Sequence, residues 1–144
     1  MNKWGQPSRS YYETSVTTSS PEQLVVMLYQ GAIRHLKQAT IEILKKDLEG
    51  KRHSIDRAVA IVQHLQNTLD MERGAEISVE LDRLYTYMLA KILDGSIKLQ
   101  TAPLEEAVKL LSTLLESWEE IARQKQVRFM PPAATPSVRL QMHG

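Results

Sequence analysis

The chain has 144 residues, of which 42% are hydrophobic and 24% are charged, and its formal net charge is +1. This composition is typical of one globular domain with its own core. The near balance of charge predicts no nucleic-acid partner, because nucleic acids attract clustered basic surface. The absence of cysteine excludes a disulfide framework and a thiolate zinc site, and it makes the cytoplasm the expected location.

The first 18 residues are polar and rich in hydroxyl groups, but they include Tyr11, Tyr12 and Val16. These side chains give enough apolar surface to dock on another surface and too little to fold alone. We therefore predict an N-terminal arm over residues 1–18, followed by a folded domain over residues 19–125.

The first helix is predicted from its cap. Ser20 followed by Pro21 and Gln23 forms a capping box, and the apolar pattern then continues to about Leu48, where Glu49-Gly50 is expected to end the helix. An apolar run from Leu24 to Tyr29 surrounds the helix axis, whereas a surface helix buries one stripe. A second apolar body is expected to cover it. The run is far shorter than the ~20 residues of a membrane helix, so no membrane insertion is expected.

Two more helices are predicted from apolar residues spaced by three and four, over about residues 51–70 and 76–99. Gly74 between them is interpreted as a left-handed stop. In the second of these helices Ile77 and Leu81 are assigned to the core face together with Leu84, Tyr85, Met88 and Ile92. Further apolar residues broaden that face and indicate contacts on two sides, namely Tyr87, Leu89, Leu93 and Ile97.

The last helix is predicted from Pro103 to about Gln124, with Trp118 in its core stripe. Four helices with short connections predict an all-α, antiparallel four-helix bundle, because short links reverse the chain direction. Residues 126–144 are basic and contain Pro131, Pro132 and Pro136, so we predict a disordered tail. Apolar tail residues leave open docking onto a groove, among them Phe129, Met130, Val138, Leu140 and Met142.

No sequence motif indicates catalysis. The Glu-x-x-His ligands of bundle metal sites are missing, as are phosphate-binding glycine loops and acyl-transfer nucleophile motifs, so no enzyme activity, metal or other cofactor is expected. His35 on a helical bundle invites comparison with histidine phosphotransfer domains. Leu36 stands where those domains have a small spacer, which makes this alternative the weaker one.

Two segments carry more apolar surface than the core requires. These are the start of the first helix, with Met27 and Tyr29, and the segment Leu84-Tyr85-Thr86-Tyr87-Met88. Together they predict grooves that hold a partner in the helix-in-groove manner, with methionine as an adaptable lining. The residues expected to contact the partner are Tyr11, Tyr12, Val16, Leu24, Met27, Leu28, Tyr29, Ile33, Leu84, Tyr85, Tyr87 and Met88.

Several stretches occur in the same order in a known family. They are Tyr11-Tyr12, Ser20-Pro21-Glu22-Gln23-Leu24, Met27-Leu28-Tyr29-Gln30-Gly31-Ala32-Ile33, Leu69-Asp70, Leu84-Tyr85-Thr86-Tyr87-Met88 and Trp118-Glu119. With them the chain resembles the flagellar secretion chaperone FliS from about Tyr11 to Trp118.

The resemblance implies a non-enzymatic cytoplasmic chaperone. Such a protein binds the disordered C-terminal region of flagellin, prevents premature polymerisation and aids type III export, with the flagellar export gate as a further partner of the complex. The arm is expected to cover the groove in the free protein, which would be a monomer or a weak homodimer. The alternative is a helical adaptor or regulatory module that binds another flagellar protein through the same grooves.

Overall fold

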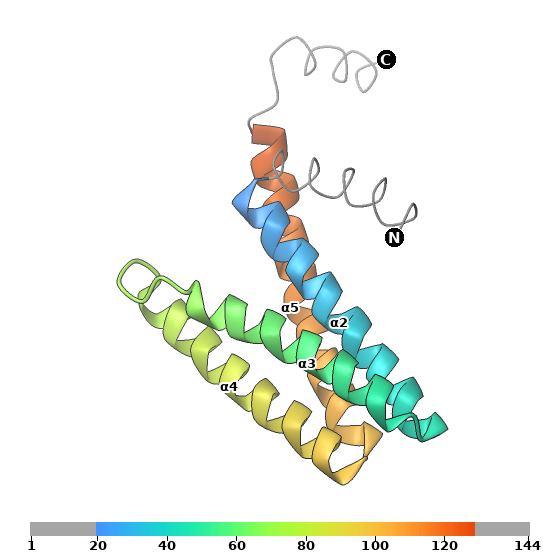
Figure 1. Cartoon of the computed structure of the whole chain (residues 1–144). Helices are drawn as coiled ribbons and strands as arrows, with labels where there is room; N and C mark the ends of the chain where they lie inside the picture. The colour runs from blue at the N-terminus through green and yellow to red at the C-terminus, as the bar shows by residue number, and fades with distance from the viewer. Residues whose placement is uncertain (1–19, 129–144) are drawn as a thin grey trace, which may run out of the picture.

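The computed structural model describes residues 20–128, which form four α-helices (Figure 1). They are α2 (Pro21–Lys45), α3 (Leu48–Asn67), α4 (Ala75–Lys98) and α5 (Thr101–Arg128), and this described part contains no strand. The prediction of an all-α four-helix bundle is confirmed. The predicted arm lies outside the described residues. So does the predicted tail, except that its first residues, 126–128, continue α5.

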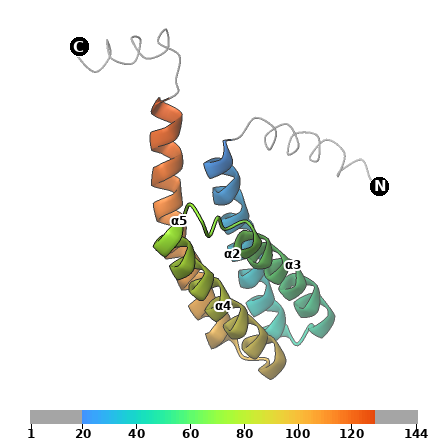
Figure 2. The same ribbon diagram turned by 90° about the vertical axis from the view of Figure 1, so that its left-hand side faces the viewer.

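The helices form a ring in which α2 and α4 each pack against α3 and α5. The α2–α3 and α4–α5 connections meet at one end of the bundle, which we call the tight end (Figure 1). At the opposite end, the open end, the longer connection of residues 68–74 joins α3 to α4. Both views show α2 and α5 extending beyond that connection (Figures 1 and 2).

The tight end is fixed by backbone caps. Lys46 adopts a left-handed conformation with φ of 62° and ends α2 before the expected Leu48. Asp47 then caps α3, because its carboxylate accepts the Gly50 N–H at 3.0 Å. The prediction that Gly50 stops a helix was therefore wrong, since Gly50 lies in the first turn of α3. Lys51 Nζ links α3 to α4 by donating to the Ser96 carbonyl and hydroxyl oxygens, both at 3.1 Å.

Caps also define the open end. The predicted capping box is present, because Ser20 Oγ accepts the Gln23 N–H at 3.2 Å and Gln23 Oε1 accepts the Ser20 N–H at 3.0 Å. Gly74 has φ of −75° and stands before α4, so its prediction as a left-handed stop was wrong. A Cβ at Gly74 would lie 2.8 Å from the Asp70 carbonyl oxygen, so close approach of the chain explains the glycine.

The core runs along the axis of the bundle and receives side chains from all four helices. Among the described residues no helix is long and apolar enough to cross a membrane. Trp118 is half-buried and packs against the core, as predicted. The largest fully buried side chains are Tyr29, Tyr85, Leu36, Met88, Ile92, Leu104, Leu111 and Val62.

Candidate binding groove

An apolar groove of about 900 Å³ opens at the open end. The first half of α4 and the connection before it form most of its wall, and Leu114 of α5 contributes from the other side. Its lining is mostly apolar and open to solvent, which is compatible with a surface that holds a polypeptide segment. The lining residues are Met71, Ala75, Ile77, Val79, Leu81, Leu84 and Leu114, with Glu76, Glu80 and Arg83 among them.

The groove exposes side chains that water solvates poorly. Ile77 is 70% exposed, and Met71 and Val79 are exposed as well. The assignment of Ile77 to the core face was therefore wrong. Ile77 is exposed because it lies in the first turn of α4, where the bundle ends. A cluster of exposed apolar side chains around a hollow marks an interaction surface.

Two buried tyrosines lie behind the groove. Tyr29 of α2 is 0% exposed and Tyr85 of α4 is 2% exposed, and their hydroxyl oxygens are 2.6 Å apart. This hydrogen bond joins the two helices that face each other diagonally across the ring. The tilted Trp118 ring lies beside Tyr29, with 6.5 Å between ring centroids. Because Leu84 precedes Tyr85 in α4, the same pair fixes the helix that lines the groove.

The tyrosine pair is neutral at physiological pH. Burial raises the pKa of Tyr85 well above its ordinary value near 10, and the hydrogen bond to Tyr29 raises it further. Burial also raises the pKa of Tyr29, against a lowering by its bond to Tyr85. Two neutral hydroxyls that satisfy each other suit an apolar core.

Beside the groove, a polar contact joins α4 to α5. The Tyr87 hydroxyl donates to Glu106 Oε2, and Lys91 Nζ lies 3.5 Å from Glu106 Oε1 and 5.5 Å from the centroid of the Tyr87 ring. The bond from Tyr87 and the charge of Lys91 lower the pKa of the Glu106 carboxyl. All three side chains remain accessible to water, so this contact orients α4 and α5 more than it stabilises them.

A smaller hollow of about 400 Å³ lies on the outer face of α2. Only Ile33 of the predicted contact residues lines it. Leu115 of α5 closes one side, and most of the remaining lining is polar or basic, so it offers less apolar contact than the groove. The hollow is lined by Gln30, Ile33, Arg34, Lys37, Gln38, Ile41 and Leu115.

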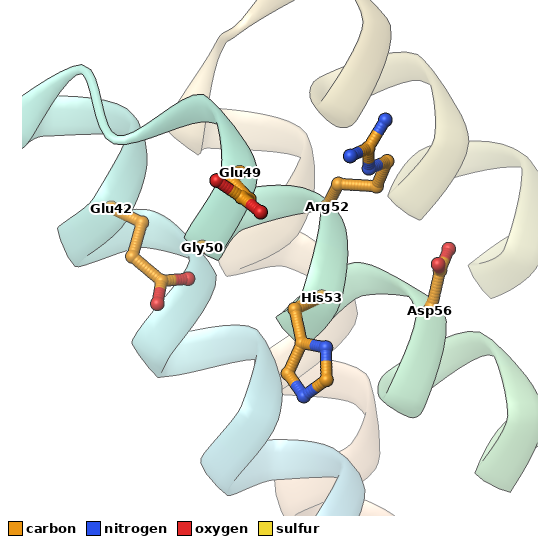
Figure 3. Close-up of a pocket in the computed structure, with 6 residues that line it drawn as sticks. All are labelled: Glu42, Glu49, Gly50, Arg52, His53 and Asp56. Carbon is orange, nitrogen blue, oxygen red and sulfur yellow. The ribbon is translucent and has the colours of Figure 1, made fainter.

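A polar pocket of about 360 Å³ lies at the tight end, with Glu42 on α2 and its other lining residues on α3 (Figure 3). The buried Glu42 carboxylate accepts hydrogen bonds from Ser54 Oγ at 2.7 Å and Gln38 Nε2 at 3.1 Å. His53 Nε2 accepts the Arg57 Nε–H at 3.0 Å. Within residues 20–128 no group of three or more histidines and carboxylates is placed to hold a metal ion. At this pocket, the hydrogen bond from Ser54 to Glu42 therefore joins α3 to α2.

His35 is the histidine for which a phosphotransfer role was the weaker alternative. It is half-buried on α2, and burial is the main cause that lowers its pKa, with the positive charges of Arg34 and Arg57 adding to it. The imidazole is therefore uncharged at neutral pH.

The structure separates the predicted contact residues into groups. Tyr11, Tyr12 and Val16 lie outside the described residues. Leu84 lines the groove, and Tyr87 is exposed beside it. Half-buried positions on α2 hold Leu24, Met27, Leu28 and Ile33, and the core holds Tyr29, Tyr85 and Met88. The role of each in partner binding stays a prediction.

Most of the groove lining was not among the predicted contact residues. Met71 and Val79 carried no assignment, while Ile77 and Leu81 were assigned to the core face. The available signal was position, since apolar residues of a core stripe can become exposed in the first turns of a helix that follows a longer connection.

Together, the fold and the groove define a helical bundle with an apolar groove at its open end. A family model described as "Flagellar protein FliS" matches residues 4–125, and the chain belongs to this family. It is 33% identical to the flagellar secretion chaperone FliS of Salmonella typhimurium, over 76% of this chain and 82% of the relative. It is 33% identical to FliSB of Pseudomonas aeruginosa, over 76% and 87%, and 28% identical to FliS of Bacillus subtilis, over 83% and 89%. The predicted family is confirmed, and it is a family of chaperones rather than enzymes.

Proposed function

We propose that this chain is a cytoplasmic flagellar export chaperone that binds the disordered C-terminal region of flagellin. In this role it prevents premature polymerisation and keeps the subunit competent for type III export. The observation that carries the proposal is the groove between α4 and α5 in a member of the FliS family. The flagellar export gate would then meet the chaperone together with its client.

The shape of the groove suits such a client. A disordered segment that folds on binding loses conformational entropy, so it needs extensive apolar contact. The groove offers this contact over about two turns of α4, from Ile77 to Leu84. A client held there would have its assembly segment covered, which explains how binding prevents polymerisation.

Two further contacts are part of the proposal. The half-buried start of α2, with Leu24, Met27 and Leu28, would extend the client site beyond the groove. The arm with Tyr11, Tyr12 and Val16 would cover this start of α2 in the free protein, since it directly precedes Ser20. The buried Tyr29, Tyr85 and Met88 would act by holding α2 and α4 in place.

Two isoleucines of α4 give a matched test. Ile77 lines the groove and is 70% exposed, whereas Ile97 is 78% exposed and does not line it. In titration calorimetry with a flagellin C-terminal peptide, Ile77→Asp should weaken binding at least tenfold, because a carboxylate loses its hydration in an apolar contact. Ile97→Asp should bind within about twofold of the native chain.

Both variants alter exposed side chains, so helicity and the unfolding midpoint are expected to stay native and confirm that binding alone is measured. Equal binding by both variants would remove the groove from the client site. Absence of binding by the native chain, together with capture of a different flagellar protein, would favour the adaptor function.

A further inference from the structure

The residues that follow α5 lie outside the part of this chain that the family model matches. The family match ends at residue 125, whereas the sequence continues to residue 144. Residues 129–144 lie outside the described part of the structure, so their role is inferred from their sequence and from where α5 ends.

This segment contains an apolar pattern of period two. Val138, Leu140 and Met142 alternate with Arg139, Gln141 and His143. In an extended chain, alternate side chains point to the same side, so the three apolar residues share one face. Such a segment suits a long, shallow apolar groove.

The segment is long enough to reach the groove. Leu114 lines the groove on α5, and α5 continues from there to Arg128, a distance of about 21 Å at about 1.5 Å per residue. Fully extended, residues 129–144 span on the order of 50 Å. The residues between Phe129 and Pro136 therefore suffice to return along α5, which leaves the alternating segment at the groove.

The charges also match. The charged side chains of the groove lining are Glu76, Glu80 and Arg83, which leaves one net negative charge. The alternating segment carries Arg139 as its fixed charge. When the apolar face points into the groove, Arg139 points toward its rim, where exposed glutamates attract it.

We propose that residues 136–144 of this chain dock in its own groove, with Val138, Leu140 and Met142 against Ile77, Val79 and Leu84. The docked segment shields the exposed apolar side chains of α4 and competes with any client for the same surface. A segment docked for about 90% of the time raises the apparent Kd of a competitor about tenfold. The inference needs the groove and not the identity of the client, so it stands separately from the proposed function.

The chain contains no cysteine, which allows a direct test by engineered disulfide formation. Ile77→Cys with Met142→Cys places one thiol in the exposed groove lining and one in the segment. The matched control adds Val138→Asp and Leu140→Asp to the same pair, which keeps the tether and removes the apolar face. At low protein concentration, the intramolecular disulfide should form at least tenfold faster in the pair without the aspartates.

A second pair, Val79→Cys with Met142→Cys, repeats the measurement if the first variant does not fold, and circular dichroism verifies folding. Equal rates with and without the aspartates would overturn the proposal. A second experiment measures the binding of a hydrophobic dye to the groove. If the aspartates had no effect on dye binding and only removal of residues 1–18 increased it, the arm would be the occupant of the groove and the proposal would be overturned.

Discussion

The two ends of the bundle, within residues 20–128, both expose large apolar side chains, and at the open end such side chains surround a groove. At the tight end Leu44, Leu48 and Ile97 are exposed around short connections, and none of them lines the groove. At the open end Met71 and Ile77 surround a hollow of about 900 Å³.

The difference lies in how the helices are joined. At the tight end, two short connections and the bond from Lys51 to Ser96 bring the helices together. At the open end, the longer connection of residues 68–74 separates α3 from α4, and α5 extends past it. At the open end the exposed apolar side chains surround a hollow, which makes them a candidate binding surface. We expect substitutions at the tight end to change mainly the free energy of unfolding, and substitutions at the open end to change mainly the affinity for a partner.

The largest expected effect separates the ends with one pair of leucines. Leu104 at the tight end is fully buried, whereas Leu84 at the groove is half-buried. Leu104→Ala should lower the free energy of unfolding by about 2–5 kcal/mol, because it leaves a cavity in the core. Leu84→Ala should lower it by about 1–2 kcal/mol, because part of that side chain already contacts water.

Urea unfolding followed by circular dichroism measures both values. The same variants should show the reverse order in binding of a flagellin C-terminal peptide, with Leu84→Ala the weaker binder. If Leu84→Ala destabilised the fold as much as Leu104→Ala and left binding unchanged, the division between the two ends would be lost.

A smaller effect is expected from the glycines inside the helices. A Cβ at Gly95 would lie 2.8 Å from the Gln100 carbonyl oxygen and 3.2 Å from Leu104 Cγ, at the tight end. Because backbone cannot move aside as a side chain does, Gly95→Ala should lower stability by about 1–3 kcal/mol.

Gly31→Ala is the matched control for this prediction. A Cβ at Gly31 would meet Ile61 Cδ1 at 3.3 Å, which is the movable end of a side chain. Its helix propensity gain of up to about 1 kcal/mol should then offset the contact. Thermal unfolding of both variants measures the difference, and equal loss in the two would contradict tight packing against backbone at Gly95.

Much of the fold could be predicted from the sequence because its signals are local. The capping box at Ser20 and the spacing of buried residues in α2 and α3 fixed those helices to within a few residues. The predicted helix ends were wrong where two local signals compete. Gly50 resembles a helix stop, but Asp47 caps the following helix and the chain reverses earlier.

The groove was harder to predict. The spacing of apolar residues shows which face of a helix is apolar, but it does not show whether other helices cover that face. Ile77 belongs to the same stripe as the buried Met88, but Ile77 lies in the first turn of α4 and Met88 near its middle. Tyr29 and Tyr85 were both predicted as contact residues, and Tyr85 also as a core residue, and the structure joins the two in the core. A hydrogen bond between distant helices has no signal in a single sequence.

The smallest effect at neutral pH is expected from this tyrosine pair. Replacing both tyrosines by phenylalanine removes two hydroxyls that satisfy each other, so stability at pH 7 should change by less than about 1 kcal/mol. Tyr85→Phe alone should lower stability by about 1–3 kcal/mol, because the buried Tyr29 hydroxyl then loses its bond to Tyr85. A double-mutant cycle by urea unfolding measures the coupling.

The effect of the tyrosine pair on stability should be larger at alkaline pH than at neutral pH. The folded pKa values of Tyr29 and Tyr85 lie above the unfolded value near 10, so the folded state keeps protons that the unfolded state has released. Their contribution to stability is complete below pH 10 and is lost as the pH rises above it, by up to about 1.4 kcal/mol per pH unit for each group that ionises only on unfolding. The double phenylalanine variant should therefore lose stability less steeply above pH 10 than the native chain. Tyr87→Phe should keep more of the native slope, because Tyr87 is exposed at the side of the groove. A double variant with the native slope would show that the pair ionises in the folded bundle, and that the core behind the groove admits charge.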